Sequence, residues 1–155
     1  SYIALPKSNT SHLMLGGWID HADFLATADS IAAKAQALGL EPTTVQHLSA
    51  TYGKDALAIL ELVEQNHELA ERINQDFPAI LAEVPYCLDS EMATTLDDIL
   101  SRRIRLGFVN QQQCLLSAPK VANLICALGH WDGPHSAFEV DQFQRGLLAQ
   151  LAPLL

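Results

Sequence analysis

The chain has 155 residues, of which nine are basic and 18 acidic, so its formal net charge is −9, and its hydrophobic fraction of 49% is sufficient for a folded core. This composition excludes intrinsic disorder. The acidic balance argues against binding to nucleic acids or anionic lipids, which require a clustered positive surface. The three cysteines have no C-x-x-C spacing, which favours reduced thiols and a cytoplasmic location over a disulfide framework.

Residues 1–19 are expected to form an irregular linker, and residues 20–155 a helical domain. Asp20 is suited to cap the first helix, because its side chain can accept a hydrogen bond from an amide of the first turn. Gly39 is expected just after the end of this helix, because glycine readily adopts the left-handed conformation that is common there.

Three further helices are expected before residue 78. One begins at Pro42 and stops at Gly53, and the next begins near Asp55 with apolar residues repeating every three to four positions. Asn66 can cap a short helix that follows. Each of these segments has one apolar side, which predicts packing against a common core.

The stretch from Pro78 to Leu88 permits two structures. A helix that opens at Pro78 is favoured, with a kink or a break at Pro85, because proline lacks the amide that would bond to the preceding turn. A strand through 80–88 is the alternative, although its apolar and polar residues alternate poorly.

Further helical segments are expected in the last two fifths of the chain. Thr95 and Asp98 have the spacing of a capping box at the start of the first. The second, from about Asn110, is expected to stop at Pro119, which would open the third, and the last begins near Pro134. The sequence therefore predicts an all-α fold, a compact bundle of about seven short amphipathic helices.

The most distinctive polar residues lie between positions 83 and 105, where three arginines fall within four positions of an acidic chain. One interpretation is a fork of guanidinium groups, from Arg102 and Arg105, that binds a phosphate or a carboxylate. The favoured interpretation is a network of ion pairs that locks two helices or docks a neighbouring domain. The candidate members are Glu83, Glu91, Asp97, Asp98, Arg102, Arg103 and Arg105.

The sequence lacks the motifs of a complete active site. No histidines have the spacing of a zinc hydrolase, no serine lies in a G-x-S-x-G turn, and neither a phosphate-binding loop nor a G-x-G-x-x-G fingerprint is present. His130, Asp132 and His135 are close in sequence, but a solvated turn is the favoured interpretation there. We therefore expect no catalytic residue, cofactor or metal in this chain itself.

Two segments, 82–91 (AEVPYCLDSE) and 95–103 (TLDDILSRR), carry a family resemblance, and weaker similarities occur at 13–17 (LMLGG), 47–53 (HLSATYG) and 128–132 (LGHWD). These segments resemble the C-terminal helical domain of FAD-dependent glycerol-3-phosphate dehydrogenases. The resemblance covers nearly the whole chain.

The resemblance implies a parent enzyme that oxidises sn-glycerol 3-phosphate to dihydroxyacetone phosphate and passes electrons through FAD to a quinone at the cytoplasmic face of the membrane. It also implies that a flavin-binding domain precedes this chain in the same polypeptide, so that no family catalytic residue can be assigned here. Residues 20–155 would then be an accessory domain, with membrane contact only through the parent. A free-standing helical interaction module and a weak anion-binding domain are alternatives, and self-association is left open.

Overall fold

The computed structural model describes residues 21–151, and the expected linker 1–19 and the cap Asp20 lie outside this range. Within it the chain forms helices, loops and one isolated antiparallel bridge, which confirms the predicted all-α bundle. The helices in chain order are α1 (His21–Ala37), α2 (Pro42–Tyr52), η2 (Gly53–Asp55), α3 (Ala56–Gln65), η3 (His67–Ala70), α4 (Glu83–Asp89), η4 (Asp98–Arg103), α5 (Leu106–Val109), α6 (Gln111–Ala127) and α7 (Gly133–Leu151).

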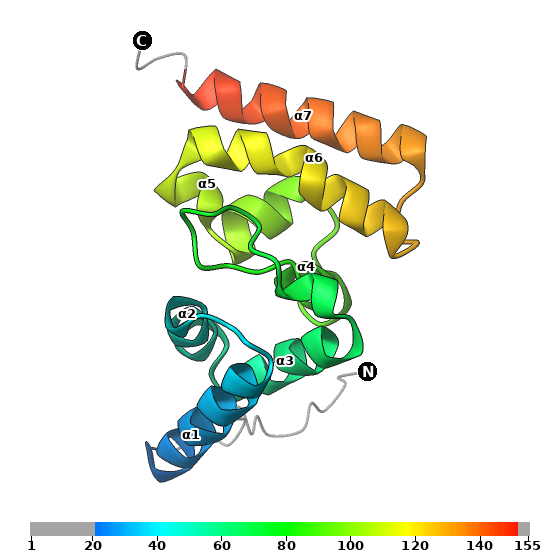
Figure 1. Cartoon of the computed structure of the whole chain (residues 1–155). Coiled ribbons are helices and arrows are strands. Elements are labelled where there is room, and N and C mark those ends of the chain that lie inside the picture. Colours follow the sequence, from blue (N-terminus) through cyan, green and yellow to red (C-terminus); the bar gives the residue numbers. More distant parts are fainter. Residues whose placement is uncertain (1–20, 152–155) are drawn as a thin grey trace, which may run out of the picture.

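The helices lie in two groups. In Figure 1, α1, α2 and α3 are at one end of the molecule and α5, α6 and α7 at the other, with α4 between them. Buried apolar side chains from both groups and from α4 belong to one hydrophobic cluster. The two groups therefore share a core, and the segments around α4 connect them.

The boundaries of the first three long helices follow the sequence signals. Gly39 and Gly53, which end α1 and α2, have positive φ angles of 73° and 55°. The Asn66 side chain caps the next turn by accepting a hydrogen bond from the Glu68 amide at 3.1 Å. That turn, η3, is a single 3₁₀ turn.

The helix expected from Pro78 begins later, at Glu83. Before it, Ile80 forms the isolated antiparallel bridge with Arg72, and a turn at Leu81 and Ala82 follows. The Leu81 amide donates to the Glu71 carbonyl at 2.8 Å and the Ala82 amide to the Leu69 carbonyl at 3.0 Å, so both amides bond to an earlier segment of the chain and not within a helix. Pro85 is the third residue of α4, where an amide has no partner within the helix, so the expected kink or break is absent. The alternative of a strand through 80–88 is also wrong.

The expected break at Pro119 is wrong as well. Helix α6 continues from Gln111 to Ala127 with Pro119 exposed inside it. Ala118 and Ala122, on either side of the proline, are buried in the core, and their packing outweighs the lost backbone hydrogen bond. The sequence signals also gave no indication of the short helix α5, whose Leu106 and Gly107 are buried.

Candidate functional site

Asp98 organises the start of η4, a π-helical segment. Its Oδ2 accepts hydrogen bonds from the amides of Thr94 and Thr95, both at 3.2 Å, and from the Thr95 hydroxyl at 2.9 Å. The Asp98 amide in turn donates to Thr95 Oγ1 at 3.1 Å, which confirms the predicted capping box. Burial acts to raise the pKa of Asp98, but the hydrogen bonds from Thr94, Arg102 and Thr95 outweigh it and lower the pKa to about 2.

Arg102 is held between two carboxylates. It pairs with Asp97 Oδ2 at 2.7 Å and with Asp98 Oδ1 one helical turn earlier. Arg105 lies just beyond η4 with a left-handed φ of 65°, is exposed, and has no ion pair with any described carboxylate. Because Arg102 is already paired with two carboxylates, the structure gives no support to the less favoured interpretation, a fork of Arg102 and Arg105 that binds an anion.

Arg103 connects η4 to the loop that follows α4. Its guanidinium donates to the Glu91 carbonyl at 2.9 Å, and its Nε lies 3.5 Å from Glu91 Oε2. These contacts lie inside the domain and bring together segments twelve residues apart. A role for the network in docking another domain stays a prediction.

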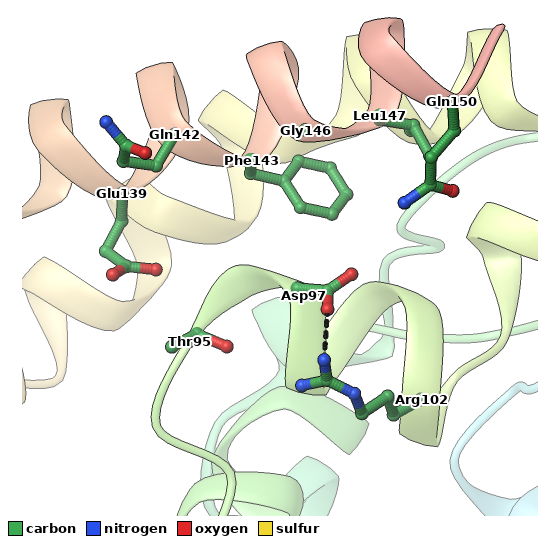
Figure 2. Close-up of a pocket in the computed structure, with 9 residues that line it drawn as sticks. All are labelled: Thr95, Asp97, Arg102, Glu139, Gln142, Phe143, Gly146, Leu147 and Gln150. Atoms are coloured by element: carbon green, nitrogen blue, oxygen red, sulfur yellow. Dashed lines mark ion pairs between the residues drawn. The ribbon is translucent and has the colours of Figure 1, made fainter.

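A pocket of about 360 Å³ lies between η4 and α7. Figure 2 shows the Asp97–Arg102 pair on one side of it and Phe143 of α7 on the other. Glu139, also on α7, accepts a hydrogen bond from the Leu96 amide at 3.2 Å. Two carboxylates and one guanidinium line this pocket, so its charge balance is acidic.

Glu83 is the predicted site residue that lies apart from the arginines. Its side chain is 0% exposed, and its Oε2 accepts hydrogen bonds from Tyr52 OH at 2.8 Å and His47 Nε2 at 2.9 Å. Its Oε1 accepts one from the Ile80 amide at 2.9 Å. Of the candidate partners of the arginines, Glu83 is the one that bonds elsewhere, because donors from α2 and from the loop before α4 surround its carboxylate.

The charge of Glu83 affects its neighbours. Burial and the nearby Glu83 carboxylate raise the pKa of Tyr52, so its hydroxyl stays protonated and donates. Burial, and then the charge of Glu91, raise the pKa of Cys87, which keeps that thiol neutral and unsuited to nucleophilic attack. The donors around Glu83 stabilise its carboxylate, and neither the Tyr52 hydroxyl nor the Cys87 thiol is activated as a nucleophile.

Within residues 21–151, His, Cys, Asp and Glu side chains nowhere gather in a group of three that could hold a metal ion. In the same part of the chain, no helix is both long and apolar enough to cross a membrane.

Comparison with known protein families shows which family the chain belongs to. The C-terminal domain of alpha-glycerophosphate oxidase matches residues 8–135. The chain belongs to this family. The sequence segments that suggested glycerol-3-phosphate dehydrogenases thus pointed to the correct group of flavoenzymes.

The curated relatives are glycerol-3-phosphate dehydrogenases. The mitochondrial enzyme of Bos taurus is 32% identical over 120 residues, which is 75% of this chain and 16% of the relative. That of Homo sapiens is 36% identical over 101 residues, 63% of this chain and 14% of the relative. The enzyme of Synechocystis sp. is 44% identical over 70 residues, 45% of this chain and 13% of the relative.

The chain thus spans about a sixth of the length of its bovine relative. No solved structure matches the chain significantly. The cytoplasmic location inferred from the cysteines is not confirmed by these relatives, because the bovine and human enzymes are named as mitochondrial.

Proposed function

We propose that this chain acts as the C-terminal accessory domain of an enzyme that oxidises sn-glycerol 3-phosphate to dihydroxyacetone phosphate, with electrons passing through FAD to a quinone. Residues 1–19 would link it to the flavin-binding domain, and residues 20–155 would cover or brace that domain. The observation that carries the proposal is the family match over residues 8–135. A peripheral attachment of the parent enzyme to a membrane belongs to the same proposal.

The geometry of the domain fits a bracing role. Arg102 is paired with two carboxylates of the same chain, Arg103 donates to the Glu91 carbonyl, and the buried Glu83 is bonded to three donors. Polar groups that are satisfied internally hold helices in place but leave little capacity for binding a substrate. The ion pairs of η4 therefore support a rigid domain more than a reactive one.

The described residues do not fit FAD. A dinucleotide pyrophosphate is bound by a glycine-rich turn at a helix N-terminus, and the sequence has no such fingerprint. The pocket between η4 and α7 would place Asp97 and Glu139 near the pyrophosphate, and their charges would repel it. We therefore assign no step of the reaction to these residues.

The proposal is tested with two proteins, this chain and the full-length enzyme that contains it. We expect the full-length enzyme to purify with flavin absorbance and to oxidise glycerol 3-phosphate with a quinone acceptor. The isolated chain should be folded by circular dichroism, colourless and inactive. Flavin that co-purifies with the isolated chain would contradict the proposal, and a native reading frame as short as this chain would favour a free-standing interaction module.

A further inference from the structure

Arg105, Phe108 and Val109 form one exposed turn, which we call the α5 ridge. The amides of Phe108 and Val109 both donate to the Arg105 carbonyl, at 3.1 and 3.3 Å, so the three residues share one helical turn. Phe108 is 81% exposed and Val109 67% exposed. Single exposed apolar residues are common, but two adjacent ones beside an arginine have the composition of a binding hot spot.

The α5 ridge is held in a fixed orientation. A Cβ added at Gly107 would lie 2.8 Å from Ser101 Oγ, so α5 packs directly against η4 at this point. Leu106 and Gly107 are buried, whereas the next two side chains, Phe108 and Val109, are exposed. A rigid apolar protrusion loses little conformational entropy when it is covered, which favours binding.

Arg105 adds a charge that the described part of the chain leaves uncompensated. No described carboxylate pairs with it, although the neighbouring Arg102 and Arg103 have such partners. A complementary surface should therefore have an apolar depression with an acidic group at its edge.

We propose that the α5 ridge is the contact by which this domain docks on the upstream flavin-binding domain of the same polypeptide. The inference rests on the proposed function, and it adds the surface and the chemistry of the partner. The bovine relative has about six times the matched length, so ample polypeptide is available to cover the ridge. A second copy fits less well, because each copy carries a net charge of −9 and a two-fold contact at the ridge would bring two Arg105 side chains together.

Hydroxyl-radical footprinting of the full-length enzyme tests the covering of the ridge. Phe138 on α7, which is 56% exposed, provides a matched phenylalanine. If the ridge is docked, Phe108 should be oxidised about fivefold more slowly than Phe138, because the centre of an interface excludes water. If the ridge is uncovered, Phe108 should be oxidised faster than Phe138, because it is the more exposed of the two in this domain. That result would overturn the proposal.

Two double variants of the full-length enzyme test the contribution of the ridge to docking. Arg105→Glu with Phe108→Ser should increase the rate at which limited proteolysis releases this domain from the full-length enzyme by about tenfold, since weaker docking lets the two domains separate more often. The control, Arg145→Glu with Phe138→Ser on α7, should cleave at the wild-type rate. Equal rates in the two double variants would also overturn the proposal.

Three outcomes distinguish docking at the α5 ridge from the proposed function and from self-association. A full-length enzyme with flavin and activity but an uncovered Phe108 would refute the α5 ridge and leave the proposed function standing. A full-length protein without flavin would refute the proposed function itself. Protection of Phe108 that disappears on dilution would identify a second copy as the occupant and would refute docking within one polypeptide.

Discussion

Glu83 places a carboxylate in the interior of the domain. A buried carboxylate is tolerated only when donors replace the water it has lost, and Glu83 has three of them. Two come from α2 and the third from the loop before α4. One side chain thus fixes the position of α4 relative to α2.

Replacing Glu83 by glutamine should destabilise the domain by about 2–4 kcal/mol. The NH2 group of glutamine would replace one carboxylate oxygen, and it cannot accept a hydrogen bond from the donor that faces it. Urea denaturation of the chain followed by circular dichroism measures this free energy. Tyr52→Phe, which removes one donor and leaves the carboxylate bonded to the other two, should cost less, about 1–2 kcal/mol. A Glu83→Gln protein as stable as the wild type would show that the carboxylate does not hold α2.

Asp98 should make the stability of the domain depend on pH in acid. Its pKa is lowered from 3.8 to about 2 in the folded chain. Its ionised form therefore contributes stability that is fully present above about pH 4 and is lost as the pH falls toward 2. Asp98→Asn should cost about 1–2 kcal/mol at neutral pH, because solvent reduces the full value of the shift.

Denaturation curves of the Asp98→Asn protein and the wild type at several pH values measure this dependence. The difference between their unfolding free energies should narrow steadily below about pH 4. A difference that is constant between neutral pH and acid would show that the pKa of Asp98 is not lowered by folding.

At the scale of the helices, local signals predicted most starts and stops but misjudged two prolines. The glycine stops and the capping box of Thr95 and Asp98 depend on a few neighbouring residues, so the sequence displays them directly. The consequences of Pro85 and Pro119 depend on where the helix begins and on what the flanking residues pack against. The π-helical geometry of η4 and the helix α5 depend on tertiary packing as well, which no local pattern reveals.

Pro119 is therefore a site where the domain can be made more stable. Pro119→Ala should raise the unfolding free energy by about 1–2 kcal/mol, because an alanine amide restores the hydrogen bond to the Leu115 carbonyl. This gain exceeds the stability that is lost when the unfolded chain regains the entropy that proline had removed. The side chain is exposed, so no core contact is lost. Thermal unfolding measures the change, and a lower melting temperature would show that α6 needs the proline.

Any side chain at position 107 should destabilise the domain. Gly107→Ala is expected to cost roughly 1–3 kcal/mol, because its Cβ would lie 2.8 Å from Ser101 Oγ. The same change should cost less in a Ser101→Ala background, in which the nearest side-chain atom would be the Cβ at 3.4 Å. Denaturation of the four proteins of this cycle measures the coupling, and purely additive costs would contradict close packing of α5 on η4.

At the scale of the whole molecule, the sequence predicted the fold class but not which distant residues meet. Helical periodicity shows which side of a helix is apolar, but not which element packs against it. Nothing in the sequence therefore indicated that Glu83 bonds to His47 and Tyr52. The pocket between η4 and α7 was missed for the same reason. The ion pairs that were anticipated lie close together in sequence: those of Arg102 with Asp97 and Asp98, and that of Arg103 with Glu91.

Helix α7 lies almost entirely beyond the residues that match the family, yet it is part of the core. Phe143 and Leu147 are buried against the rest of the domain. Deleting residues 133–155 should lower the unfolding free energy by roughly 3–6 kcal/mol, at about 1.5–3 kcal/mol for each of these side chains. Urea denaturation measures the loss, and an unchanged midpoint would show that α7 is only an appendage.

The three cysteines differ in burial, so a thiol-reactive probe should label one of them selectively. Burial raises the pKa of Cys87, and burial followed by the charge of Asp97 raises that of Cys114 to about 12, so neither thiol should react readily with a maleimide. Cys126 is partly exposed near the turn between α6 and α7, with its sulfur 3.6 Å from the Asp132 carbonyl. A single fluorophore on the native sequence would therefore report on the opening of that helical hairpin without any engineered residue.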